Sequence, residues 1–260
     1  MSRHELSFLN GLSDDDRILL SKLLDWNEAA EEKYITRFSS FLDERQCSLA
    51  EKALKSVRAQ NYRFFGGYDG AERKMLCIYA PYSEINDSDF PMKAIEISFR
   101  GEVGLSHRDI LGSLMALKIT RDCIGDILVE KGRAVVFLKD IAADEALMSV
   151  RKIGRTGVKL ALCDRPVQPP EIQYKEINGT VASLRLDCVT ALAIRQSREK
   201  TAALIRSGLV QTDHEITESP AKMIEEGDVI SVRGYGKFLL RSVNGTTAKD
   251  RIHITVCKYI

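Results

Sequence analysis

The chain has 260 residues, of which 44% are hydrophobic, and a formal net charge of +1. This composition is that of a globular protein rather than a disordered one, and no apolar run approaches the roughly 18–20 residues that cross a membrane. The six cysteines form no CxxC pair, which argues against a zinc site and a disulfide framework and favours small buried thiols in a reducing cytoplasm.

Charge is spread unevenly along the chain. Residues 1–91 carry a net charge of −4, residues 92–178 carry +2 and residues 179–260 carry +3. Proteins that bind nucleic acid concentrate positive charge on the surface that meets phosphate. The imbalance is mild, and it is consistent with an RNA-binding surface in the last two thirds of the chain.

The first ninety residues predict a helical region that ends in a glycine-rich loop. Ser13 and the three acids after it are typical of a helix start, and further helices are expected over 29–38 and 42–56. The loop 63–74 combines glycines, aromatics and cations before an apolar strand over 75–79. Aromatic rings and cations can clamp unpaired bases, which makes Arg73 a candidate RNA contact. A tight connection with the rings buried beneath it explains the same pattern equally well.

Residues 91–165 alternate between strand and helix patterns. Strands are expected over 94–99, 126–129, 134–138 and 158–162, and helices over 106–117 and 142–152. This order is that of a ferredoxin-like βαββαβ domain. A basic group near its end contains glycines that allow a phosphate backbone to approach closely. Its candidate contacts are Arg151, Arg155 and Lys159, with a solvated turn as the alternative.

A proline-containing linker over 166–178 precedes a terminal domain over 179–260. This domain is predicted to contain two short helices followed by a small sheet. Leu186, Val189 and Leu192 recur at helical spacing, Ser197 is a good N-cap, and Gly208 suits the position after a helix.

Cations gather around the two predicted helix starts of the terminal domain. Free N–H groups at the second helix and nearby guanidinium groups make a place for a phosphate, with a merely solvated surface as the alternative. The candidate contacts are Arg185, Ser197, Arg198, Lys200 and Arg206.

A later glycine-flanked loop over 233–238 supplies the last candidates. It can stack one base while contacting phosphates, and the alternative is a plain hairpin with Phe238 in the core. The candidates here are Arg233 and Lys237, together with Tyr235.

The segment that begins at Arg185 resembles the alpha-L RNA-binding domain of the S-four type. In related alpha-L proteins an arginine at the start of each helix contacts RNA, and the matching positions here are Arg185 and Arg198. Ala191 stands where some alpha-L domains carry a cation. The resemblance therefore implies an RNA surface that binds somewhat less strongly than in those domains.

Over essentially the whole chain, the sequence resembles the YlmH family. The resemblance is carried by the loop 65–73 and the segments 105–112, 124–127 and 233–238. It implies a bacterial, cytoplasmic RNA-binding protein, often encoded near cell-division genes. Members are similar to factors that engage the large ribosomal subunit with peptidyl-tRNA during rescue of stalled translation.

Together these observations predict an α+β, non-enzymatic, monomeric protein that binds ribosomal RNA and tRNA. No catalytic residue, metal or cofactor is expected. One alternative is an RNA-modifying enzyme with an unrecognised site in the middle domain. Another is a cell-division adaptor that binds protein through the acidic N-terminal helices. Perturbed buried groups in a middle-domain pocket would favour the enzyme, and an exposed apolar stripe on the N-terminal helices would favour the adaptor.

Overall fold

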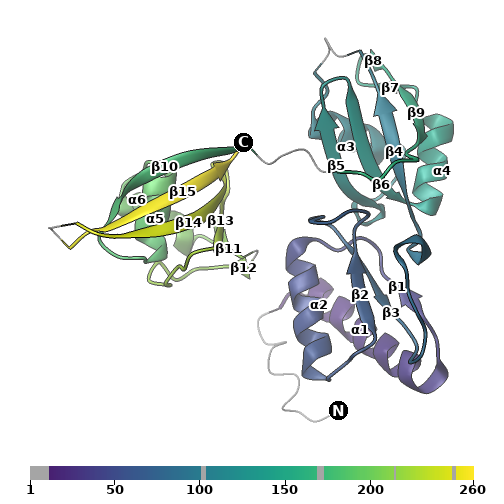
Figure 1. Cartoon of the computed structure of the whole chain (residues 1–260), viewed down its shortest axis with the longest axis horizontal. Coiled ribbons are helices and arrows are strands. Elements are labelled where there is room, and N and C mark those ends of the chain that lie inside the picture. Colours follow the sequence, from purple (N-terminus) through teal and green to yellow (C-terminus); the bar gives the residue numbers. More distant parts are fainter. Residues whose placement is uncertain (1–11, 101–103, 169–172, 214, 248–249) are drawn as a thin grey trace. The chain divides into compact units, whose positions relative to one another are not determined.

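The computed structural model describes residues 12–100, 104–168, 173–213, 215–247 and 250–260 (Figure 1). The chain divides into two compact units, Met1–Pro170 and Glu171–Ile260. Both units combine helices with antiparallel sheet. The predicted α+β class is confirmed.

The N-terminal part of the first unit is a small sheet with two helices, which corrects the expectation of a helical region over 1–90. Its elements are α1 (Asp14–Lys33), β1 (Arg37–Phe38), α2 (Glu44–Ser56), β2 (Tyr62–Phe65) and β3 (Met75–Ile78), and the strand order is β1–β3–β2. Helix α1 ends at Tyr34, whose left-handed backbone releases the chain into β1. Strands of two and four residues are too short to show a period of two in the sequence.

The central part of the first unit is a four-stranded sheet with two helices. Its main elements are β4 (Met92–Ser98), α3 (His107–Ala116), β5 (Ile124–Glu130), β6 (Arg133–Lys139), α4 (Asp140–Ser149) and β9 (Lys159–Leu162). The strand order is β5–β6–β4–β9, and each neighbouring pair is antiparallel. A hairpin of β7 (Lys152–Ile153) and β8 (Thr156–Gly157) lies between α4 and β9, and short 3-10 turns occupy Asp87–Asp89 and Arg121–Cys123.

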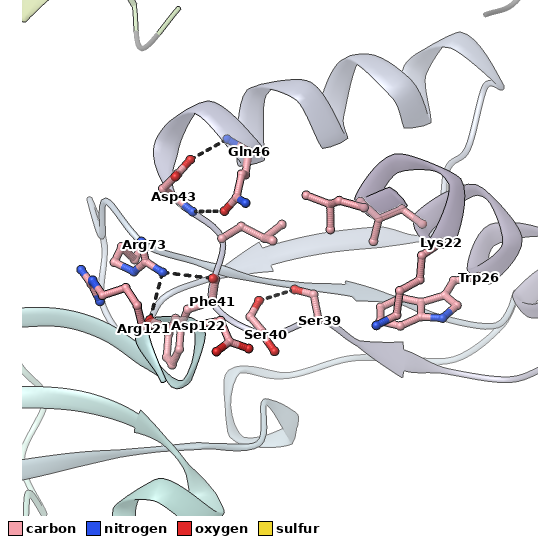
Figure 2. Close-up of a pocket in the computed structure, with 13 residues that line it drawn as sticks. Lys22, Trp26, Ser39, Ser40, Phe41, Asp43, Gln46, Arg73, Arg121 and Asp122 are labelled. Carbon is pink, nitrogen blue, oxygen red and sulfur yellow. Dashed lines mark hydrogen bonds between the residues drawn. The ribbon is translucent and has the colours of Figure 1, made fainter. Parts of the chain in front are cut away.

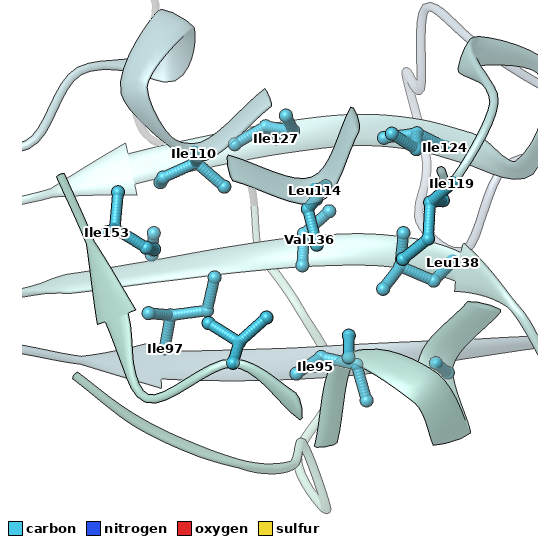
Figure 3. Packing of buried hydrophobic residues seen from close by; sticks show 14 of the residues in the cluster. Ile95, Ile97, Ile110, Leu114, Ile119, Ile124, Ile127, Val136, Leu138 and Ile153 are labelled. Carbon is cyan, nitrogen blue, oxygen red and sulfur yellow. The ribbon is translucent and has the colours of Figure 1, made fainter. Parts of the chain in front are cut away.

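Both faces of the central sheet are buried. On one face, Ile95 and Val136 pack against Ile110 and Leu114 of α3 (Figure 3). On the other face, Val135 and Phe137 share a core with Phe41, Met75, Cys77 and Phe90 from the N-terminal part. The apolar run 134–138 in β6 is typical of a strand covered on both sides. The N-terminal and central parts therefore share one core instead of separating at residue 90.

Gly67 lies where the N-terminal loop crosses the central sheet. Its φ is +99°, and a Cβ there would lie 2.2 Å from Cδ1 of the buried Phe137. Gly70 in the same loop also has a positive φ, of +85°, but has open space around it. Because overpacking of a core costs about 1–3 kcal/mol, Gly67→Ala is expected to lower the free energy of unfolding by that much more than Gly70→Ala. Urea unfolding of both variants measures the difference, and equal losses would contradict this packing.

The second unit is a six-stranded antiparallel sheet with two helices. Its elements are β10 (Tyr174–Val181), α5 (Leu186–Ile194), α6 (Arg198–Arg206), β11 (Val210–Thr212), β12 (Glu215–Ile216), β13 (Val229–Val232), β14 (Gly236–Thr246) and β15 (Ile252–Tyr259). The strand order is β10–β15–β14–β13–β11–β12. Leu186 and Ile205 from the two helices are fully buried with Phe238 and Val256 of the sheet. The helices are thus anchored on one sheet face.

Strand β10 corrects the predicted boundary at residue 179. It begins at Tyr174 and pairs with β15 along its whole length, from Tyr174 opposite Tyr259 to Val181 opposite Ile252. The predicted linker 166–178 therefore includes the first half of a strand, and part of it, residues 169–172, lies outside the described residues. Alternation in this strand is interrupted by Asn178 and Gly179, which look like turn residues in the sequence alone.

Candidate nucleic-acid interface

The starts of α5 and α6 meet on one buried carboxylate. Arg185 is the N-cap residue of α5, and Arg198 is the first residue of α6. Asp187 accepts hydrogen bonds from Arg185 Nε at 3.2 Å and Nη2 at 3.1 Å, and from Arg198 Nε at 2.9 Å. One acid therefore holds two guanidinium groups next to each other.

The two arginines remain accessible although they are paired. The side chain of Asp187 is only 5% exposed, whereas those of Arg185 and Arg198 are 36% and 54% exposed. Within the described part of the chain, Nη1 and Nη2 of Arg198 and Nη1 of Arg185 have no hydrogen-bond partner. The cluster keeps a net positive charge and unused donors that face solvent, which suits the recognition of phosphate.

The charge on Asp187 is secured by the arginines. Burial alone would raise the pKa of Asp187, but the hydrogen bonds from Arg185 and Arg198 outweigh it and lower this pKa to about 2. The same contact raises the pKa of Arg185. The carboxylate is therefore ionised at neutral pH and fixes the direction of both guanidinium groups.

A pH dependence follows from this lowered pKa. Because the ordinary pKa of an aspartate is about 3.9, the stability that Asp187 contributes is present above about pH 4–5 and is lost as the pH falls towards 2. We expect Asp187→Asn to lower the free energy of unfolding at pH 7 by about 1.5–3 kcal/mol, the scale of hydrogen bonds to charged groups. The gap between the two proteins should shrink as the pH falls from about 5 to about 2.

Denaturant unfolding at several pH values measures this gap. Asp25→Asn is the matched control, since Asp25 is exposed and has no partner among the described residues. This control should change stability by no more than about 0.5 kcal/mol. A gap for Asp187→Asn that stays constant down to pH 2 would show that the carboxylate is not held by the arginines.

The remaining candidates on α6 are exposed. The hydroxyl of Ser197 accepts a hydrogen bond from the backbone N–H of Lys200 at 3.2 Å, so Ser197 caps the helix. Lys200 lies in the first turn and Arg206 in the last, and both side chains are exposed. The cap occupies one of the donors that could bind an anion. Because Lys200 lies in the first turn of α6 and Arg206 in its last, Lys200 is the closer of the two to the arginine pair.

The candidates in the β13–β14 turn do not share one environment. Arg233 is exposed beside a cavity of about 500 Å³, which Gly208 and Leu209 also line. Tyr235 packs partly against the core. Lys237 lies with its Nζ 5.4 Å from the centre of the Tyr259 ring. Only Arg233 is therefore fully open to solvent.

The basic group of the central part lies around the β7–β8 hairpin. Arg151, Arg155 and Lys159 are all exposed, and Gly154 takes the positive φ that the tight turn requires. Nη1 of Arg151 donates to the carbonyls of Leu147 at 3.1 Å and Val150 at 3.0 Å, which fixes this side chain at the end of α4. The hairpin is a second basic surface in the first unit.

Arg73 is not part of either basic surface. Its Nε donates to the carbonyl of Ile124 at 2.9 Å, and its Nη2 donates to the carbonyls of Phe41 and Arg121, each at 3.2 Å (Figure 2). Burial lowers the pKa of Arg73. The side chain satisfies three carbonyls that join the N-terminal and central parts. Arg73 is therefore a structural residue of this junction and not one of the proposed RNA contacts.

Arg73 lines a cavity of about 410 Å³ that also contains Arg121. Figure 2 shows these two side chains together at one end of the cavity and Trp26 with Lys22 at the other. Nη1 of Arg121 donates to the carbonyls of Ile124 at 2.7 Å and Gly125 at 3.3 Å. The guanidinium groups of Arg73 and Arg121 are thus both bound to backbone carbonyls and hold neighbouring strands and turns together.

Sequence reasoning missed the buried anchor beneath the arginine pair. Asp187 was visible only as part of the Arg185–Leu186–Asp187 run, and its contact with Arg198 depends on how α6 crosses α5. Within the described residues, no group of three or more His, Cys, Asp or Glu side chains could hold a metal ion. None of the helices searched there is long and apolar enough to cross a membrane.

The fold and a matching family model define the class: an α+β protein with an RNA-binding domain. Residues 86–166 match the model described as "Putative RNA-binding domain in YlmH". The chain is 32% identical over 246 residues to the ribosome-associated protein quality control protein P2 of Bacillus subtilis (strain 168), covering 93% of this chain and 94% of the relative.

A solved structure of the cell division protein ylmH from Streptococcus pneumoniae is also similar. It shares 27% sequence identity with a TM-score of 0.50, and the match covers 59% of this chain and 94% of that chain. The chain therefore belongs to the YlmH family.

Proposed function

We propose that this protein is a non-enzymatic, ribosome-associated RNA-binding protein that acts in the rescue or quality control of stalled translation. The relative from Bacillus subtilis is named for ribosome-associated quality control, and the matched family model is named for RNA binding. The observation that carries the proposal is the pair of accessible arginines fixed on Asp187. The proposed ligands are ribosomal RNA of the large subunit and tRNA, in the cytoplasm and without a cofactor.

The architecture supports this proposal in both units. We assign residues 174–260 to the alpha-L type, with Arg185 and Arg198 at the starts of its two helices. We assign residues 91–165 to the ferredoxin-like type, since the sheet order is β5–β6–β4–β9 with both helices on one face. The β7–β8 hairpin is an addition to that type.

The proposed mechanism is positioning of structured RNA. Arg185, Arg198 and Lys200 contact phosphates from the second unit, and Arg151, Arg155 and Lys159 do so from the first. Contacts with phosphate fix the position and orientation of an RNA without reading its sequence. When two linked surfaces bind together, the second contact benefits from a high effective concentration. Binding is therefore tight only on an RNA whose geometry reaches both surfaces.

The described surface of α1 does not favour the adaptor alternative. The exposed large hydrophobic residues there are Ile18, which is 67% exposed, and Tyr34, also 67% exposed, at the C-cap. They are separated by most of a 20-residue helix, which is about 30 Å long. An apolar docking surface requires a contiguous patch, and these two residues do not form one.

Crosslinking in cells followed by sequencing of the bound RNA tests the proposal. The wild type should enrich ribosomal RNA of the large subunit and tRNA. A variant with Arg185→Ala and Arg198→Ala should lose most of this enrichment at an equal protein level. Enrichment of messenger RNA alone, or an unchanged pattern for the variant, would contradict the proposal.

A further inference from the structure

Another cavity lies at the C-terminal end of α5, beside β10, β15 and the β13–β14 turn. Its volume is about 240 Å³. The charged side chains that line it are all cations, Lys175, Arg195 and Lys258. Among the described residues, no carboxylate forms an ion pair with any of these three. The other lining residues are Ile177, Ala193, Ile194, Tyr235 and Phe238.

Two of these cations are placed where they repel each other. Lys175 of β10 lies directly opposite Lys258 of β15 in the strand register. Like charges at directly opposed positions of an antiparallel pair destabilise a sheet. An anion bound between the two ammonium groups would remove this repulsion. The register therefore creates a local site for negative charge.

The third cation, Arg195, lies at the end of α5. Arg195, the C-cap residue of α5, has φ 53° and ψ 47°, a left-handed conformation that favours glycine or asparagine. The same conformation ends α1 at Tyr34, so at Arg195 it terminates the helix and turns the chain. The helix end thus places the exposed guanidinium of Arg195 at the cavity. Three cations from three separate segments therefore line one small cavity.

An aromatic ring completes the cavity wall. The turn that carries Tyr235 is flanked by Gly234, with φ +85°, and Gly236, with φ +111°. A Cβ at position 236 would lie in ordinary van der Waals contact with Cε of Lys258, at 3.4 Å, so the lysine stem runs beside this turn. The Nζ of Lys258 lies 5.7 Å from the centre of the Phe238 ring. The wall therefore combines the side chain of Tyr235 with three positive charges.

We propose that this cavity binds one nucleotide of single-stranded RNA, with its base against Tyr235 and its phosphate among Lys175, Arg195 and Lys258. Aromatic stacking combined with cations is how proteins hold unpaired nucleotides. The cavity is smaller than the about 300–1,000 Å³ that encloses a drug-sized ligand, so it suits one small group. The proposal rests on the proposed function, in that its ligand is RNA.

This site is separate from the arginine pair. Arg185 precedes α5 and Arg195 follows it, and the nine residues between them span about 14 Å along the helix. An RNA that occupies both places would lay a structured part on Arg185 and Arg198 and an unpaired nucleotide in the cavity. The two contacts can be removed independently.

The test uses the full-length chain and a single-stranded oligouridine of about 10 nucleotides, the length that one small binding fold covers. The double variant Lys175→Gln and Lys258→Gln removes the opposed charges. Arg241→Gln is its control in the same unit, because Arg241 is exposed and already paired with Glu176 at 2.7 Å. Tyr235→Leu removes the ring, and Tyr235→Phe keeps it.

The double lysine variant should bind the oligomer about tenfold more weakly or worse, while its melting temperature stays equal or rises. Tyr235→Leu should weaken binding of the oligomer by about fivefold or more but leave binding of an abasic oligomer of the same length unchanged. Tyr235→Phe and Arg241→Gln should both bind like the wild type. Uridine monophosphate should compete only at far higher concentration than the oligomer.

Unchanged oligomer binding by the double lysine variant would overturn the cavity proposal. So would a mononucleotide that binds as tightly as the oligomer, because the cavity would then hold a free nucleotide. Binding of structured ribosomal RNA by the Arg185 and Arg198 variants separates this failure from that of the proposed function. If those variants lose binding while the lysine variant does not, only the cavity proposal fails.

Discussion

Replacing Arg198 by alanine is expected to weaken binding of ribosomal RNA by about 1–3 kcal/mol, and Arg185→Ala should act similarly. Each arginine supplies donors on an accessible face, and these form charge-assisted hydrogen bonds with phosphate. The double variant should lose more than either single one. The loss of binding free energy in the double variant need not equal the sum of the two single losses, because both side chains contact Asp187.

Stability must be measured beside binding for these variants. Removing both arginines leaves the buried carboxylate of Asp187 without its partners, which is destabilising in itself. A triple variant that adds Asp187→Asn removes the unpaired charge. If the triple variant regains stability but still binds RNA weakly, the loss of binding belongs to the guanidinium groups.

Arg241→Ala is the matched control for Arg198→Ala. The two side chains are 55% and 54% exposed, and each is paired with one carboxylate. Both substitutions remove one positive charge from the same unit. Equal losses of RNA affinity for the two variants would mean that overall charge, and not the arginine pair, carries binding.

Replacing Asp126 by alanine is expected to lower the free energy of unfolding by about 3–5 kcal/mol, because each buried donor that loses its acceptor costs about 1–3 kcal/mol. Asp126 is 9% exposed and accepts hydrogen bonds from the Tyr68 hydroxyl at 2.7 Å and from the backbone N–H groups of Glu72 at 2.7 Å and Arg73 at 3.0 Å. Burial and the contact with Asp126 raise the pKa of Tyr68. The variant leaves three donors without their acceptor.

Urea unfolding and hydrogen exchange together test this prediction. The Glu72 and Arg73 amides should lose protection first, because the loop 66–74 is held to β5 by this carboxylate. Asp69→Ala is the control in the same loop, since Asp69 is exposed and has no partner within the described part. Exchange that is equally slow in the Asp126 variant and in the wild type would contradict the role given to Asp126.

The sequence predicted those elements whose signals are local. Ser197 and Gly208 bracket α6 as expected, and the strand predicted at 75–79 is β3. Leu186 and Ile205 are fully buried, whereas Leu192 and Leu204 are only partly buried against the same core. Capping and periodicity are properties of a few neighbouring residues, so one sequence is sufficient to show them.

Features that depend on distant contacts could not be predicted in this way. Strand β1 forms only because Arg37 and Phe38 pair with β3 about forty residues later. The loop containing Arg73 has the composition of an RNA-binding loop. The guanidinium of Arg73, however, donates hydrogen bonds to the carbonyls of Phe41, Arg121 and Ile124. Lys175 and Lys258 are more than eighty residues apart, and only the register of β10 and β15 brings them together.

The most direct test of the central claim is a salt titration of ribosomal RNA binding by the wild type, Arg185→Ala, Arg198→Ala and Arg241→Ala. If Arg185 and Arg198 contact phosphates, each of their variants should lower the slope of log affinity against log salt by about one unit or less. Arg241→Ala should follow the wild type. Wild-type affinity and slope for both Arg185→Ala and Arg198→Ala, at low and at moderate salt, would contradict the proposed RNA surface.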